Sequence, residues 1–156
     1  LGTMGYGLGA AIGAKVGNPE KSVINAAGDG SFFMNMNELS TIAKFQIPVI
    51  ELVFDNGVLG MVRQWQKLFY DGRFSQTTIE RQTDFKKLAA AFGIEFFEIL
   101  KKSDVKNVLK KALTCGKPVL IDCKIDKDIN VLPMVPAGAS ILEPILEINS
   151  REEQTR

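Results

Sequence analysis

Residues 22–32 read Ser-Val-Ile-Asn-Ala-Ala-Gly-Asp-Gly-Ser-Phe, and this stretch decides the fold class. Its first part, Ser22–Ala26, is a short run rich in β-branched and small residues, as in a buried strand. Gly28-Asp29-Gly30 follows almost at once. Ligands of open α/β sheets gather beyond the carboxyl ends of the strands, so the triplet stands where a binding site is expected. Taken alone, however, Gly-Asp-Gly is more often a β-turn than a metal site.

Alternating strand and helix patterns extend on both sides of this stretch. Further strands are expected at residues 48–54, 95–99 and 118–123. Helical patterns alternate with these strands. They cover residues 7–16, residues 84–92 and a segment that starts at Ser103 and ends before Gly116. A further helix is expected where Asn35 can form a capping box with Glu38. This alternation predicts an α/β fold, a parallel sheet with helices on both faces.

Two segments lack such periodicity. Residues 66–82 are polar, and we expect a surface segment or a lid there. Residues 127–156 contain three prolines, and we expect a tail that wraps a neighbouring surface and frays at 151–156. Phe69, Tyr70 and this tail are the candidates for exposed apolar surface.

Composition bounds the possible functions. The chain has 156 residues, 19 Lys and Arg against 18 Asp and Glu, and no His. This length predicts a single domain, 1–156. A net charge of +1 gives no case for a nucleic-acid or membrane partner, and the lack of His excludes Ser-His, Cys-His and His-ligated zinc chemistry within the chain.

The cysteines and the first residues bear on location and processing. Cys115 and Cys123 are too few for a disulfide framework, so we expect structural thiols and a cytoplasmic protein. The sequence starts at Leu1 with nothing like a signal peptide, which suggests a fragment or a processed product.

A second glycine-rich candidate lies at the start of the chain. Residues 5–10, Gly-Tyr-Gly-Leu-Gly-Ala, fit the relaxed dinucleotide pattern G-x-G-x-x-A, with Asp29 at a plausible distance for a ribose contact. That motif needs a strand immediately before it, and only four residues precede Gly5. Glycines that allow close helix packing are the stronger interpretation.

Oxygen donors follow two of the predicted strands. Asp29 comes after the first, and Asn56 follows the strand at 48–54, with 25 residues between Gly30 and Asn56. The backbone N–H groups of Gly28 and Gly30 can face phosphate oxygens, but the Asp29 carboxylate repels phosphate unless a cation lies between them. Mg²⁺ binds oxygen ligands and commonly combines one or two protein ligands with phosphates. The pattern therefore favours a Mg²⁺-phosphate site, with a plain turn at 55–57 as the alternative.

These residues resemble the motif of a known enzyme family. Gly-Asp-Gly followed by Asp55-Asn56 resembles the cofactor motif of thiamine-diphosphate-dependent enzymes, in which an Asn-Asn pair is usual and the second, ligating Asn is kept here. Within them the chain resembles the carboxyl-terminal domain of acetolactate synthase large subunits over nearly its whole length. The stretches that carry this likeness are residues 1–8, 28–32, 34–35, 38–39, 59–66, 68–70 and 131–136.

The resemblance implies a metal site and a phosphate site. Mg²⁺ would be held by the side-chain oxygens of Asp29 and Asn56 and by the carbonyl oxygen of Val58. Two diphosphate oxygens and a water would complete its six ligands. The residues implied in diphosphate binding are Gly28, Gly30, Ser31 and Gly60.

Roles for larger side chains follow in the same way. Met4 would be the apolar wedge that bends the cofactor into a V, and Met61 would line the cofactor pocket. Trp65 would border the substrate entrance, where herbicides bind in related enzymes. Without the motifs, all three would be taken as core residues.

The family also implies parts that lie outside this chain. Its members decarboxylate pyruvate and join the two-carbon unit to pyruvate or 2-oxobutyrate, in branched-chain amino-acid biosynthesis. The catalytic Glu belongs to a pyrimidine-binding domain of a second subunit, and a central domain holds FAD. We therefore expect no catalytic residue and no synthase activity in this chain, and a parent homodimer or tetramer with a possible regulatory small subunit.

Three alternatives remain at the level of sequence. The first is another enzyme of the superfamily, such as pyruvate oxidase or indolepyruvate decarboxylase, although residues 61–65, Met-Val-Arg-Gln-Trp, favour the synthase. The second is a stand-alone binding or regulatory module that has lost the chemistry. The third is a nucleotide-binding Rossmann domain built on the glycines at 5–10.

Overall fold

A four-stranded parallel sheet forms the centre of the computed structural model, which describes residues 2–79 and 83–147. The strands are β1 (Val23–Gly28), β2 (Val49–Asp55), β3 (Glu95–Ile99) and β4 (Val119–Lys124), in the order β1-β2-β4-β3. All neighbouring strands are parallel. The predicted α/β class is confirmed, and all four predicted strands are present.

The register brings the carboxyl ends of the strands to one edge. Gly28 of β1 is paired with Phe54 of β2, and Phe54 with Cys123 of β4. β1 runs two residues beyond its predicted end at Ala26, so it ends at Gly28. The residues that follow β1 and β2 are therefore neighbours at this edge.

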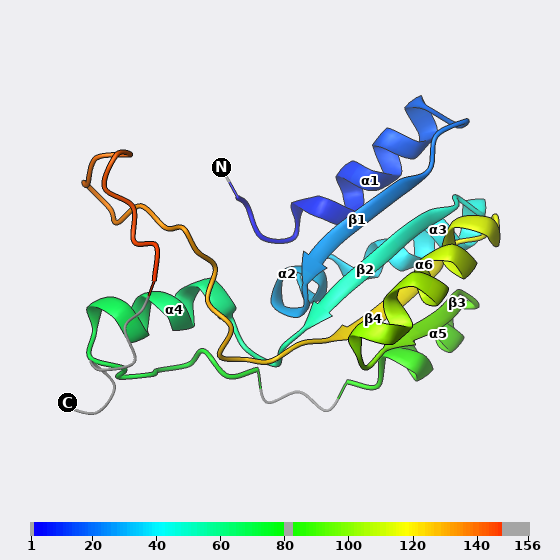
Figure 1. The fold of residues 1–156 in the computed structure, drawn as a ribbon. Coiled ribbons are helices and arrows are strands. Elements are labelled where there is room, and N and C mark those ends of the chain that lie inside the picture. Colours follow the sequence, from blue (N-terminus) through cyan, green and yellow to red (C-terminus); the bar gives the residue numbers. More distant parts are fainter. Residues whose placement is uncertain (1, 80–82, 148–156) are drawn as a thin grey trace.

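Helices cover both faces of the sheet, as predicted, but unequally. α1 (Tyr6–Gly17), α2 (Asp29–Phe33), α3 (Leu39–Phe45) and α5 (Phe85–Phe92) contribute to one core with the sheet, and α6 (Val105–Thr114) contributes to a second core on the other face (Figure 1). The first core contains Leu8, Phe32, Leu39, Ile42, Phe85 and Ala89. α6 does not cover all of its face, because Ile24 of β1 remains 45% exposed.

Two predicted helix starts were wrong. Asn35 does not cap a helix with its side chain: Met36–Glu38 form a 3₁₀ turn, α3 begins at Leu39, and the Glu38 carboxylate accepts from Thr41 Oγ1 at 2.7 Å instead. Ser103 lies in a second 3₁₀ turn, Lys102–Asp104, which precedes α6. In both places a 3₁₀ turn precedes the α-helix and shifts its start by several residues.

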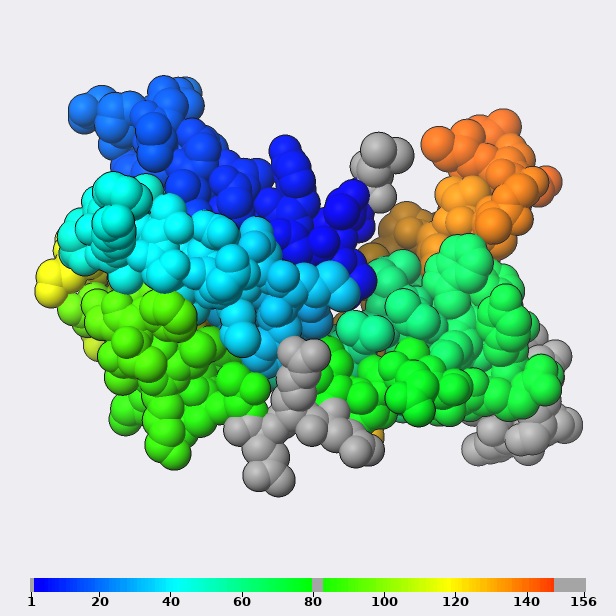
Figure 2. Space-filling view, turned by 180° about the vertical axis from the view of Figure 1, so that it is seen from behind, coloured from blue at the N-terminus to red at the C-terminus, as the bar shows by residue number. Residues whose placement is uncertain are grey.

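The segment predicted as a surface loop or lid contains the end of an unpredicted helix, α4 (Gly60–Phe69). α4 points away from the sheet and lies beside the orange-red C-terminal segment (Figure 1). In the space-filling view these two parts form a lobe that stands apart from the body of the sheet (Figure 2). Phe69 and Tyr70 are exposed, as predicted.

The C-terminal segment, residues 127–147, is held by local pairing. Met134 and Ile145 form an antiparallel bridge, with N···O distances of 3.0 and 2.7 Å. The predicted fraying at 151–156 lies outside the described residues. Both cysteines are free thiols, with Cys123 buried. Over the described ranges, no helix has the length and apolarity that a membrane crossing requires.

Candidate functional site

Asp29 joins the two loops that leave β1 and β2. The chain passes from Gly28 directly into α2, so the Gly-Asp-Gly triplet starts a helix and does not form the alternative β-turn. Asp29 Oδ1 accepts from the Gly30 N–H at 2.8 Å, and Oδ2 accepts from the Gly57 N–H at 2.9 Å. The carboxylate therefore fixes the position of the loop that carries Asn56.

The Asp29 carboxyl is buried without a cationic partner. The residue is 2% exposed, and among the described residues no Lys or Arg side chain forms an ion pair with it. Burial raises the pKa of Asp29 to about 6, the N–H bonds from Gly30 and Gly57 lower it, and nearby Asp55 raises it further. Buried charges are normally paired or coordinate metals, so a divalent cation would offset the unfavourable burial.

Asn56 lies in a tight turn directly after β2. Its Oδ1 accepts from the Val58 N–H at 3.1 Å, and Gly57 has φ of +68°, a conformation that glycine adopts without strain. A Cβ on Gly60 would lie 3.1 Å from Asn56 Nδ2. The structure thus brings Asp29 and Asn56 together, as predicted from the strand ends, with Val58 and Gly60, which the resemblance named, beside them. Coordination through the Val58 carbonyl stays a prediction.

The chain start packs against the same site. A Cβ on Gly30 would lie 2.6 Å from Leu59 Cδ2 and 3.5 Å from Met4 Cε, so only glycine fits there without displacing a neighbour. Ser31 Oγ accepts from the Gly5 N–H at 3.0 Å. Met4 therefore lies beside the Gly30 backbone. Its role as the wedge beneath the cofactor stays a prediction.

The backbone at the end of β1 is open. Gly28 is exposed, and among the described residues no atom other than those of its chain neighbours lies within 4 Å of the position of its Cβ. A ligand can therefore approach this part of the backbone directly. Glycine at the end of a strand, oxygen donors on two adjacent loops and an unpaired buried carboxylate together fit a Mg²⁺-diphosphate group.

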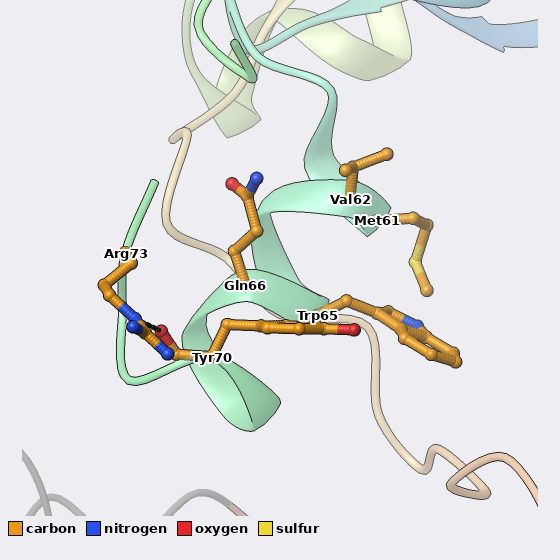
Figure 3. A pocket seen from close by; sticks show the side chains of 6 residues that line it. All are labelled: Met61, Val62, Trp65, Gln66, Tyr70 and Arg73. Atoms are coloured by element: carbon orange, nitrogen blue, oxygen red, sulfur yellow. Dashed lines mark hydrogen bonds between the residues drawn. The ribbon is translucent and has the colours of Figure 1, made fainter. Parts of the chain in front are cut away.

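Met61 and Trp65 line a separate cavity of about 490 Å³ on α4. Its other lining residues are Val62, Gln66, Tyr70 and Arg73 (Figure 3). Trp65 contacts Phe69 edge-on, with ring centroids 5.3 Å apart. Gly60, next to Asn56, is the first residue of α4, so this helix connects the oxygen-donor site to the cavity.

The comparisons with known proteins agree with this geometry. Residues 1–123 match the family described as thiamine pyrophosphate enzyme, C-terminal TPP binding domain. The chain belongs to this family. The dinucleotide-binding alternative at residues 5–10 finds no support, because these glycines open α1 and no strand precedes them in residues 2–5.

Individual relatives of this thiamine pyrophosphate-binding domain are similar over most of its length. The acetolactate synthase isozyme 2 large subunit of Escherichia coli is 46% identical over 96% of this chain and 27% of its own length. The acetolactate synthase large subunit of Pyropia yezoensis is 49% identical over 90% of this chain and 24% of its own. The chain thus spans about a quarter of these relatives.

A solved structure supports the same fold. The thiamine diphosphate-dependent 4-hydroxybenzoylformate decarboxylase of Rhodococcus jostii superposes with a TM-score of 0.73 at 30% identity. The match covers 79% of this chain and 23% of that protein. The parallel sheet of this thiamine pyrophosphate-binding domain is therefore shared with a decarboxylase as well.

Sequence reasoning missed one segment of the thiamine pyrophosphate site. Residues 77–79 pair with the 57–59 loop: the Leu59 N–H donates to the Thr77 carbonyl at 2.8 Å, and the Ile79 N–H to the Gly57 carbonyl at 2.7 Å. Nothing in the polar segment 66–82 marks this pairing, since it uses backbone groups.

A buried polar pair behind the site was also missed. Asn25 Nδ2 donates to both carboxyl oxygens of fully buried Glu51, at 2.9 and 2.8 Å. Burial raises the pKa of Glu51 to about 7, against a smaller lowering by the Asn25 bond. Glu51 inside an apolar strand was the signal that could have revealed this pair.

Proposed function

We propose that this chain is the thiamine-diphosphate- and Mg²⁺-binding domain of an acetolactate synthase large subunit. The observation that carries the proposal is the Asp29 carboxylate, buried without a cationic side chain and bonded to the loop that presents Asn56. The 46% and 49% identities to acetolactate synthase large subunits support this specific member of the family.

The residues of the site divide into three groups in this proposal. Asp29 and Asn56 hold Mg²⁺ through side-chain oxygens, and Val58 through its carbonyl. The diphosphate would be bound by the backbone at Gly28, Gly30 and Gly60 and by Ser31. Met4 supports the bent cofactor, Met61 lines its pocket and Trp65 borders the substrate entrance.

Thiamine diphosphate, when bound, supplies the electron sink for decarboxylation and for carbon–carbon bond formation. The chain's own residues bind and orient it. Asp29 would place a negative charge against the metal. Glycine at position 30 lets Leu59 pack against the start of α2, since any Cβ there would meet Leu59. The wall formed by Met61 and Trp65 provides an apolar surface for a small 2-oxo acid.

Other parts of the proposed enzyme belong to the parent protein. It is a transferase that uses pyruvate with pyruvate or 2-oxobutyrate, in the cytoplasmic synthesis of branched-chain amino acids. The catalytic Glu and the FAD-binding domain lie outside this chain, in a homodimer or tetramer with a possible regulatory subunit. Neither nucleic acid nor a membrane is part of the proposal.

Product analysis of the full-length protein tests the proposal. With pyruvate, thiamine diphosphate and Mg²⁺ we expect acetolactate, and with added 2-oxobutyrate the mixed product. The 156-residue chain alone should form neither. Release of an aldehyde with no carbon–carbon bond formation would instead support a decarboxylase, the second candidate, which the Rhodococcus neighbour favours.

A further inference from the structure

Helix α4 contacts the rest of the described chain mainly through polar side chains. Of its residues, all of which the structure describes, only Gln64 is buried, at 3% exposure. A surface helix normally buries its apolar stripe and exposes its polar side. In α4 the large apolar side chains Met61, Val62, Trp65 and Phe69 are between 38% and 47% exposed, and only Leu68 is half-buried. Apolar packing within the described residues is therefore a weak constraint on the rotation of α4.

The Gln64 side chain forms a pair of hydrogen bonds with the backbone of one residue in the C-terminal segment, Val131. Its Nε2 donates to the Val131 carbonyl at 3.0 Å, and its Oε1 accepts from the Val131 N–H at 2.7 Å. The same Nε2 lies 3.2 Å from Met134 Sδ. Met134 is itself paired with Ile145, so the partner of Gln64 is held in place.

Neighbouring polar side chains of α4 support this attachment. Arg63 donates to Asp128 Oδ1 from Nε at 3.0 Å and from Nη2 at 2.8 Å, and its guanidinium lies 3.8 Å from the centre of the Phe74 ring. Gln66 donates to the Ser75 carbonyl at 3.0 Å. These contacts are more exposed than those of Gln64, and exposed ion pairs contribute little. Gln64 is therefore the central contact.

We propose that Gln64 is a positioning residue that fixes the rotation of α4, so that Met61 and Trp65 line the cavity. Gln64 does not line the cavity itself; Met61 and Trp65 project from α4 into it (Figure 3). Buried amides must keep their hydrogen bonds, and only one rotation of α4 aims Gln64 at Val131. The catalytic part of this inference rests on the proposed function.

The test uses the full-length protein with Gln64→Met, which keeps the side-chain length but cannot form the paired amide bonds. Gln46→Met, at the exposed end of α3, is the matched control. By hydrogen exchange we expect residues 60–69 and 128–134 to exchange at least about tenfold faster in Gln64→Met, while residues 23–33 stay protected as in the wild type. The control should leave all three regions unchanged.

Kinetics provide the second readout. We expect kcat/KM for pyruvate to fall at least about tenfold, mainly through KM. The Kd for thiamine diphosphate should rise by a clearly smaller factor, since of these side chains only Met61 is proposed to face the cofactor. The inference would be overturned if residues 60–69 of Gln64→Met exchanged at the wild-type rate. It would also be overturned if Gln64→Met lost as much cofactor affinity as kcat/KM, because that result indicates general structural damage. If the wild-type protein does not turn over pyruvate, the proposed function fails and the exchange experiment alone decides the inference.

Discussion

Replacing Glu51 with Gln should remove a pH dependence of stability that a single buried carboxyl creates. Glu51 is fully buried, and its only hydrogen-bonding side chain among the described residues is Asn25. Burial raises its pKa from 4.5 to about 7. At about 1.4 kcal/mol per pKa unit, this shift corresponds to about 3 kcal/mol.

Whether stability rises or falls with pH depends on which state, folded or unfolded, binds the Glu51 proton more tightly. The folded chain holds the Glu51 proton up to about pH 7, whereas the unfolded chain releases it near 4.5. The stability that Glu51 contributes is therefore complete below pH 4.5 and is lost as the pH rises to about 7. The amide in Glu51→Gln cannot titrate and keeps the shape of the protonated acid. The free energy of unfolding of Glu51→Gln, relative to wild type, should rise by about 3 kcal/mol across this window and stay constant above it.

Urea unfolding at a series of pH values measures this difference. Taking the difference between the two proteins removes the titration of Asp29 and every other group that both share. Glu20→Gln, in the exposed turn before β1, controls for the loss of one negative charge. A difference between Glu51→Gln and wild type that stays flat from pH 4.5 to pH 7 would refute the reasoning.

Three further predictions concern the site and its support. Asp29→Ala in the full-length protein should abolish Mg²⁺-dependent binding of thiamine diphosphate in calorimetry, and unchanged affinity would exclude the metal assignment. Gly7→Ala should lower the free energy of unfolding by about 1–3 kcal/mol, because its Cβ would lie 2.5 Å from Asn25 Oδ1. Gly13→Ala in the same helix, with open space around its Cβ, should instead raise the free energy of unfolding by about 1 kcal/mol, and denaturant titration of both separates close contact from helix propensity. Gly30→Ala should weaken cofactor binding at least about tenfold with little effect on Mg²⁺-free stability, because its Cβ would displace the flexible end of Leu59 in the loop beyond Asn56. Full cofactor affinity would show that binding does not depend on this packing.

Apolar periodicity predicted the parts of the fold that bury apolar side chains. Strands β2 and β4 are buried on both faces and appear in the sequence as nearly continuous apolar runs. α4 was missed although its apolar side chains recur at helical spacing, at positions 61, 65, 68 and 69. Most of these side chains are exposed and the buried side chain of α4 is the amide of Gln64, so the periodicity identifies the helix but not the side by which it packs. The 3₁₀ turn before α3 has no side-chain cap, whereas in the one before α6 Asp104 Oδ2 accepts from the Lys101 N–H at 3.1 Å.

The order and direction of the strands predicted the location of the site better than the residue types of its motif did. Asp29 and Asn56 are each weak signals alone, but parallel strands must place both at one edge, and the bond from the Gly57 N–H to Asp29 shows that their loops touch. The pairing of residues 77–79 with this loop could not be predicted, because it depends on backbone bonds between segments without a pattern.

Two of the buried acids, Asp29 and Glu51, show how local surroundings separate a structural carboxyl from a functional one. Glu51 faces an amide that donates to both of its oxygens, and it is closed in behind Gly7, so it has its partner within the fold. The hydrogen bonds that the structure gives to the Asp29 carboxylate within residues 2–79 and 83–147 come from backbone N–H groups, one in α2 and one in the loop that carries Asn56. Asparagine at position 29 would keep one oxygen acceptor but would set an N–H₂ group against a backbone N–H, so the loop contact would weaken even without metal. Two single variants, Asp29→Asn and Asn56→Ala, separate the structural role from metal binding. Each is assayed for stability without Mg²⁺ and for Mg²⁺-dependent cofactor binding. We expect Asp29→Asn to reduce both quantities and Asn56→Ala to reduce chiefly binding, whereas unaltered binding in both variants would place the metal elsewhere.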